Sequence, residues 1–151
     1  MSFRTSFLAS ILGLAAAGVA LADTNPAVDA RQAQFTLFAH NLAVVGSMAQ
    51  GRMDYDADVA QTAADNLFHL TRHDQGRMWP EGTDADSIEG TRALPEIWAD
   101  LDDFTMKFAA LQDAAEALQG VAGNGMEALR PAVGQLGGAC AACHDNYRAE
   151  Q

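Results

Sequence analysis

Two cysteines and a histidine near the end of this 151-residue chain carry its clearest chemistry. Cys140 and Cys143 are separated by two alanines, and His144 follows directly. On a helix, residues three apart lie on one face, so the two thiols can each form a thioether with a vinyl group of one porphyrin. The imidazole of the histidine can then bind the porphyrin iron. The pattern C-x-x-C-H is the attachment signature of a c-type haem and predicts one covalent haem c per chain.

Three other uses of a C-x-x-C pair fit this sequence less well. A disulfide between the two cysteines would close a very short loop and stabilise little. A thioredoxin-like redox pair belongs at a helix N-terminus after a strand, whereas this pair falls late in a helical pattern. A zinc site would need further ligands, and the chain has no other cysteine. Haem attachment is therefore the preferred interpretation.

The first 22 residues have the pattern of a secretory signal peptide. Arg4 precedes an uncharged apolar run over residues 7–21, and residues 20–22 form an A-x-A cleavage site. The run is too short for a good transmembrane helix. We expect export to the periplasm and a mature domain of residues 23–151.

The mature chain is strongly acidic. The full chain has 9 basic and 20 acidic residues, and removal of residues 1–22 takes away only Arg4, which leaves a net charge of −12 with histidine neutral. A surface of this sign argues against binding to nucleic acid or to an anionic membrane. It favours a basic partner, or it simply keeps the protein soluble.

Apolar residues recur every three or four positions in four segments, which predicts four helices. The expected helices are residues 26–50, 56–75, 95–119 and 126–150. Asn25 and Pro26 fit the N-cap and first turn of the first helix. No segment has the alternation of a strand, so the sequence predicts an all-α, antiparallel four-helix bundle with a covalently attached haem. Cys140 and Cys143 continue the apolar spacing of the last helix, which places both thiols on its inward face.

The first helix carries a second apolar stripe beside the one expected to pack in the bundle. Leu37, Val44 and Met48 form this stripe. It indicates either contact with another subunit or deeper burial of the helix in its own bundle.

Residues 76–94 form the one long connection, and a loop of this length in a bundle is usually functional. Its Trp79 is expected to shield a haem edge, to anchor the loop, or to do both. His69 and His73 precede the loop one helical turn apart. They lack further ligands for a metal, so we expect both to be solvated.

Several stretches besides the haem motif resemble one family. The motif lies near the C-terminus and is followed by Tyr147-Arg148, and residues 31–35 read R-x-x-x-Φ near the start of the first helix. The third helix opens with Pro-Glu-Ile-Trp at residues 95–98, and Phe104 follows. In these features the chain resembles the class II c-type cytochromes, specifically the cytochrome c′ family, over its whole mature length.

The resemblance implies a role for each matching residue on the proximal side of the haem. Cys140 and Cys143 match the thioether cysteines, and His144 matches the proximal iron ligand. Arg148 matches a basic residue beside that histidine, where a positive charge opposes protonation of the imidazole. Its position near the end of a helix is also favourable to the helix dipole.

The resemblance also implies roles around the rest of the haem. Arg31 and Gln32 match residues near the haem propionates, where a guanidinium suits a carboxylate. Phe104 is expected to contact the porphyrin. Phe35 matches the distal position over the iron, where some relatives have a methionine that binds the metal.

Phenylalanine cannot bind iron, so the resemblance implies a five-coordinate, high-spin centre in an apolar pocket. Such a centre is expected to bind nitric oxide or carbon monoxide, to transfer electrons, or both, and to form a homodimer through the first two helices. The main alternative is a low-spin, six-coordinate carrier of electrons. A haem peroxidase is a third reading, but Gln32 is the one candidate acid–base residue within a turn of Phe35, so no enzyme is expected.

Overall fold

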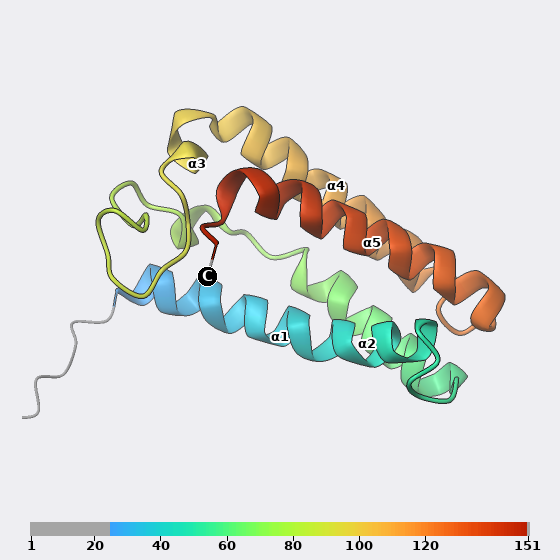
Figure 1. Ribbon diagram of the computed structural model, residues 1–151. Coiled ribbons are helices and arrows are strands. Elements are labelled where there is room, and N and C mark those ends of the chain that lie inside the picture. Colours follow the sequence, from blue (N-terminus) through green and yellow to red (C-terminus); the bar gives the residue numbers. More distant parts are fainter. Residues whose placement is uncertain (1–24, 151) are drawn as a thin grey trace, which may run out of the picture.

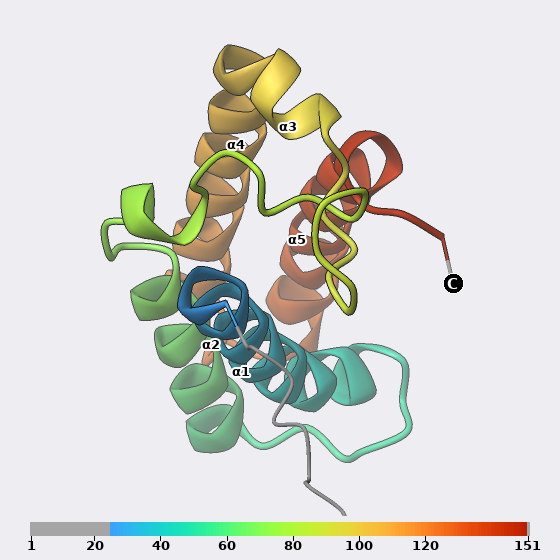
Figure 2. The ribbon, with the colours of Figure 1, turned by 90° about the vertical axis from the view of Figure 1, so that its left-hand side faces the viewer.

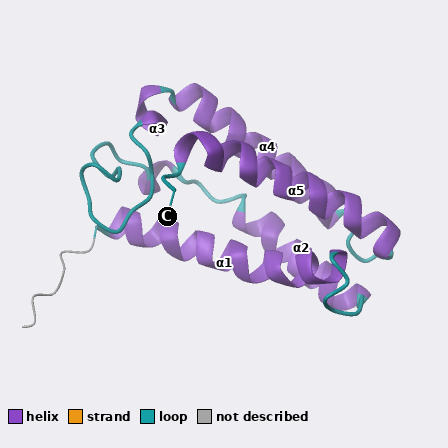
Figure 3. Ribbon diagram, in the orientation of Figure 1, coloured by secondary structure: helices purple, strands orange, loops and turns teal. Residues whose placement is uncertain are grey.

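Four long helices pack side by side and make up most of the described chain (Figure 1). The computed structural model describes residues 25–150, so the signal peptide predicted for residues 1–22 lies outside them. The long helices are α1 (Pro26–Ala49), α2 (Ala57–Leu70), α4 (Leu101–Gln119) and α5 (Met126–Tyr147). Helices and loops make up the described residues, apart from one isolated bridge (Figure 3). The predicted all-α four-helix bundle is confirmed.

Side-chain caps explain where three of these helices begin. The side chains of Asn25, Asp56 and Asp100 accept hydrogen bonds from amides in the first turns of α1, α2 and α4. Each cap satisfies an amide that has no partner within the helix. Helix α5 instead begins after Gly125, whose φ of 100° is a left-handed conformation that glycine adopts readily.

Two of the predicted helices differ from the observed ones near the long loop. The second helix ends at Leu70 rather than near residue 75, because the amides of Thr71 and Arg72 bond to carbonyls three residues earlier and tighten the last turn. The predicted third helix is broken at Asp100, which has φ −141° and ψ 71° and caps α4 with its side chain. The part before the break is the short helix α3 (Glu96–Ala99).

The predicted fourth helix also ends earlier, at Tyr147 rather than near residue 150. Its end is set by pairing with the loop that precedes α3. The Leu94 amide donates to the Tyr147 carbonyl over 3.0 Å, and the Ala149 amide donates to the Arg92 carbonyl over 2.9 Å. The chain therefore leaves the helix in an extended conformation to meet the loop.

The bundle has a large apolar core along its length and a smaller one at the loop end. The large core includes Met48, Leu67 and Leu136, each about 1% exposed. Met48 of the second stripe on α1 is therefore core, whereas Leu37 of the same stripe is 51% exposed. The stripe is thus buried at Met48 and exposed at Leu37, and contact of Leu37 with another subunit stays a prediction. No helix within residues 25–150 has the length and apolar character of a membrane span.

The loop between α2 and α3 lies across one end of the bundle (Figure 2). It contains the short 3₁₀ helix η1 (Gly76–Met78) and then Trp79. Trp79, Trp98 and Phe104 pack against the smaller core at this end. The loop thus covers the same end of the molecule at which the C-x-x-C-H motif lies.

Candidate haem site

A cavity of about 370 Å³ opens at the loop end of the bundle. Helices α1, α4 and α5 and the end of the long loop all contribute to its lining. All eight residues that the sequence singled out line it: Arg31, Gln32, Phe35, Phe104, Cys140, Cys143, His144 and Arg148. The fold therefore brings together residues that are more than a hundred positions apart in the chain.

The two thiols lie half-buried on the inward side of α5 and form no disulfide. Burial raises the pKa of both Cys140 and Cys143, and nearby cations only partly oppose this effect. The thiols are therefore protonated at neutral pH. A redox-active C-x-x-C pair has a lowered thiol pKa, so these cysteines do not have the character of a thioredoxin-like site.

His144 stands in the last turn of α5 and faces Phe35 across the cavity. Their ring centroids are 6.5 Å apart, with the rings nearly perpendicular. Burial lowers the pKa of His144, and the charges of Arg148 and Arg92 lower it further. A neutral imidazole has a free nitrogen lone pair, which is the form that binds a metal.

Aromatic rings form one wall of the cavity. Trp79 contacts Phe104 edge-on with centroids 4.8 Å apart, and Phe104 contacts Tyr147 in the same way at 5.5 Å. The Trp98 indole N–H donates to the Trp79 carbonyl over 3.0 Å. Trp79 therefore anchors the loop, which is one of the two roles expected from the sequence. Its side chain also lines the cavity.

The charged residues of the lining are all basic. Arg31, Arg92, Lys107 and Arg148 line the cavity, and among the described lining residues no aspartate or glutamate is present. This is unusual in a chain with 20 acidic and 9 basic residues. An apolar cavity with basic groups and thiols suits a large apolar ring that carries carboxylates, such as the porphyrin of haem and its propionates.

Arg31 lines the cavity, and both of its terminal nitrogens bond to the long loop. Nη1 donates to Thr83 Oγ1 over 2.8 Å, Nη2 donates to Thr91 Oγ1 over 2.7 Å, and further bonds go to the backbone carbonyls of Met78 and Thr83. The side chain is 2% exposed, and burial lowers its pKa. Arg31 thus fastens the long loop to α1, and its expected place near the haem propionates stays a prediction.

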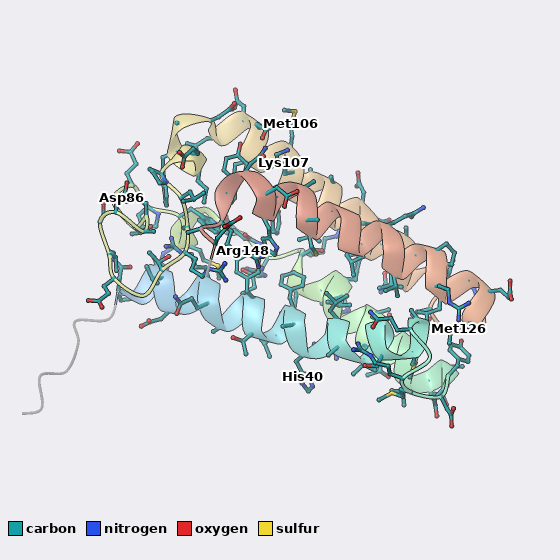
Figure 4. The ribbon with its side chains drawn as sticks, in the orientation of Figure 1. His40, Asp86, Met106, Lys107, Met126 and Arg148 are labelled. Atoms are coloured by element: carbon teal, nitrogen blue, oxygen red, sulfur yellow. The ribbon has the colours of Figure 1, made fainter. Side chains whose placement is uncertain are left out.

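Gln32 also bonds to the loop, because its Nε2 donates to the Gly90 carbonyl over 2.8 Å. Sequence reasoning missed Arg92 and Lys107, which line the same cavity. Both are among the few basic residues of an acidic chain, and this scarcity could have marked them as candidates for the site. Lys107 and Arg148 lie at the loop end, whereas His40 points away from the bundle on the outer side of α1 (Figure 4).

A hydrogen bond between α4 and α5 fixes the wall of the cavity below the thiols. The Tyr147 hydroxyl donates to Asp103 Oδ2 over 2.6 Å, and Lys107 Nζ lies 3.5 Å from the same carboxylate oxygen. The hydrogen bond to Asp103 raises the pKa of Tyr147 to about 12. The two helices are thus tied together where Cys143 and His144 stand.

Among residues 25–150, no cluster of three side chains could hold a bare metal ion.

Comparison with known proteins agrees with this geometry. The family model described as Cytochrome C′ matches residues 26–148. The chain belongs to the cytochrome c′ family. Family membership makes it a c-type haem protein with a four-helix bundle fold.

Relatives of the cytochrome c′ family match almost the whole chain. A cytochrome c′ of Cereibacter sphaeroides is 38% identical over 148 residues, which covers 98% of this chain and 99% of the relative. A cytochrome c-554 of the same organism is 38% identical over 121 residues, which covers 80% and 79%. A solved cytochrome c′ structure from Rhodobacter Spheriodes is 40% identical, with a TM-score of 0.81 over 83% of this chain and 96% of that one.

Proposed function

We propose that this chain is an exported haem protein with a five-coordinate, high-spin iron that binds nitric oxide or carbon monoxide, and that electron transfer is a second use of the same iron. One observation carries the proposal. Within residues 25–150, the cavity lining contains no methionine and no histidine besides His144. A sixth ligand from the protein would have to come from this lining.

Each lining residue then has a distinct task. Cys140 and Cys143 would hold one haem by thioether bonds, since both cysteines of the chain belong to one motif. The neutral imidazole of His144 would bind the iron. The haem supplies an iron that takes up a gas molecule and changes its oxidation state, while the protein decides which molecules reach it.

Phe35 is the residue that selects the ligand. Its ring contacts Phe38, with centroids 6.0 Å apart, and Trp79 at 6.5 Å, so it stands in an aromatic group on the distal side. A phenylalanine has no hydrogen-bond donor to stabilise the partial negative charge of bound dioxygen. An apolar, crowded site of this kind favours small uncharged diatomic molecules.

We propose no enzymatic activity for this site. A peroxidase needs a distal acid–base group, and Gln32, the candidate nearest to Phe35, has its amide nitrogen bonded to the Gly90 carbonyl. Peroxidase turnover at an enzyme-like rate would contradict this part of the proposal.

The proposed protein lies in the periplasm and forms a homodimer. Residues 1–22 would direct export to the periplasm, which is where attachment of a c-type haem fits. A homodimer would form through α1 and α2, whose outer face carries the exposed Leu37 and Val59 beside a groove lined by His40 and Val44. A solved cytochrome c′ that is 27% identical, with a TM-score of 0.75, is described as showing ligand-controlled dimer dissociation.

A low-spin electron carrier is the second candidate, and the relatives of this chain include a cytochrome c-554 that is 38% identical over 80% of it. It would need a methionine or histidine at the iron. Met48 is buried in the bundle core, and Met106 is 63% exposed on α4. Neither lines the cavity, so this candidate is less well supported.

The test is a titration of the reduced holoprotein with nitric oxide, followed by its absorption spectrum. We expect one molecule to bind per chain, carbon monoxide to bind at the same site, and dioxygen to form no stable complex. Failure to bind nitric oxide, or a stable complex with dioxygen, would contradict the proposal.

A further inference from the structure

The backbone on both sides of Arg148 is tied to the end of the long loop. Ala93 and Arg148 form an isolated antiparallel bridge. The Leu94 amide donates to the Tyr147 carbonyl over 3.0 Å, and the Ala149 amide donates to the Arg92 carbonyl over 2.9 Å. These bonds hold the residues before and after Arg148, so they fix where its side chain starts.

The side chain of Arg92 adds a clamp to this pairing. Its Nε donates to the Ala149 carbonyl over 2.8 Å, and its Nη2 donates to the same oxygen. Two donors of one guanidinium therefore hold one carbonyl. Lysine has a single ammonium and cannot reproduce this fork.

Arg148 itself has no such anchor. Its side chain is exposed, lines the cavity and forms no hydrogen bond or ion pair with any residue in 25–150. It stands one helical turn after His144: the Arg148 amide donates to the His144 carbonyl over 3.1 Å, and both residues line the same cavity. The position of the Arg148 guanidinium therefore depends on the backbone at residues 147–149. Arg92 helps to hold that backbone through the Ala149 carbonyl.

The loop segment that carries Arg92 is itself fixed to the opposite side of the cavity. Thr91, the preceding residue, accepts a hydrogen bond from Arg31 of α1 over 2.7 Å. Arg31 is one turn of α1 before Phe35. A short strap, defined as residues Thr91 to Leu94, thus joins the helix that bears Phe35 to the tail beside His144.

We propose that Arg92 is a positioning residue, which holds Arg148 beside His144 through the Ala149 carbonyl and so sets the proximal charge at the iron. The inference rests on the proposed function, in which His144 binds a haem iron. A cation near an iron disfavours its more positive ferric state, because like charges repel. An Arg148 side chain that is no longer held in place should therefore lower the reduction potential.

The experiment is a double-mutant cycle on the holoprotein, with the reduction potential measured by spectroscopic titration. Arg92→Lys keeps the charge at position 92 and removes the fork. When Arg148 is present, we expect Arg92→Lys to raise the ratio of ferric to ferrous protein about threefold at a fixed solution potential, relative to the unmutated protein. In the Arg148→Ala background the same substitution should have no effect, since the cation that Arg92 positions is gone.

A second readout follows the clamp directly. Hydrogen exchange at the Ala149 amide should become faster in Arg92→Lys in both backgrounds. Arg130→Ala is the matched control, because Arg130 Nε also donates to a backbone carbonyl, that of Ala49, over 2.9 Å. Arg130 lies near the start of α5, the end marked by Met126, far from Arg148 (Figure 4). It should leave both the potential and the exchange of the Ala149 amide unchanged.

Three outcomes in the Arg92→Lys variants would overturn the inference. These are an unchanged potential in Arg92→Lys, an equal shift of the potential in both backgrounds, and unchanged exchange of the Ala149 amide. A shift of the same size in Arg130→Ala would overturn it too, since the effect would not be specific to the proximal side. Failure of the proposed function would look different, because the unmutated protein would then lack covalent haem or nitric oxide binding before any variant is compared.

Discussion

The character of the site depends on a single residue, Phe35, which faces the proposed iron ligand from the other side of the cavity. Replacing it with alanine would remove the ring whose centroid lies 6.5 Å from that of His144. We expect Phe35→Ala to speed carbon monoxide binding about tenfold, which corresponds to roughly 1.4 kcal/mol of barrier. Flash photolysis measures this rate.

Phe68→Ala provides the control for this substitution. Phe68 belongs to α2, packs against His69 and Arg72, and does not line the cavity. Its loss should leave the binding rate unchanged. An equal acceleration in both variants would show that general loosening of the bundle, and not the distal ring, limits access to the iron.

At the scale of the helices, the tie between α4 and α5 is expected to make stability depend on pH. The pKa of Tyr147 is raised from 10.0 to about 12 by the hydrogen bond to Asp103. The unfolded chain therefore loses this proton at lower pH than the folded protein does. The stabilisation is fully present below pH 10 and is lost as the pH rises from about 10 to about 12.

Chemical unfolding at several alkaline pH values tests this prediction. Tyr147→Phe should be less stable at neutral pH and should lose less stability than the unmutated protein between about pH 10 and pH 12. Tyr55→Phe is the matched control, because the Tyr55 hydroxyl bonds to the backbone of Ala122 and Gly125 and to no carboxylate. If Tyr147→Phe kept the full alkaline slope, another group would be responsible for it.

Helix α5 carries exposed glycines that have no packing role within the described chain. A methyl group added at Gly137 or Gly138 would meet no atom within 4 Å. Glycine in the middle of a helix costs about 0.5–1 kcal/mol relative to alanine. Each Gly→Ala substitution at these two positions should raise the free energy of unfolding by that amount. Gly125→Ala should lower it, since φ is 100° there.

The sequence predicted much of the helical framework because its signals are local. Apolar spacing and the caps at Asn25 and Pro26 depend only on neighbouring residues, and they located the first helix well. The break at Asp100 was missed because the apolar spacing continues through it. The early end of α5 was missed because it depends on pairing with the distant Leu94.

The sequence predicted which residues line the candidate site better than it predicted the hydrogen bonds that they form. The C-x-x-C-H motif places three residues by spacing alone, and the resemblance supplied Phe35, which indeed faces His144. The partners of Arg31 could not be predicted, since they lie in an irregular loop about fifty residues away. Arg92 carries no local pattern, so only the folded chain shows that it reaches the tail.

At the scale of the whole molecule, the proposed dimer makes a prediction about assembly. Leu37 and Val59 are exposed by 51% and 45% on the outer faces of α1 and α2. In a symmetric dimer, Leu37→Glu would place one carboxylate from each subunit in the apolar interface. Burying these two charges is costly, so we expect the variant to sediment as a monomer. Met106→Glu, on the exposed side of α4, should leave the dimer intact. A protein that sediments as a monomer without substitution would contradict the prediction.

The number of iron ligands can be read from the resonance Raman spectrum of the reduced holoprotein at neutral pH without added ligand. Its spin-state bands report how many ligands the iron has. We expect a five-coordinate, high-spin iron, because the described lining contains no methionine and no histidine besides His144. A six-coordinate, low-spin spectrum of the pure protein would show that a second side chain binds the iron and would rule out the proposed open site.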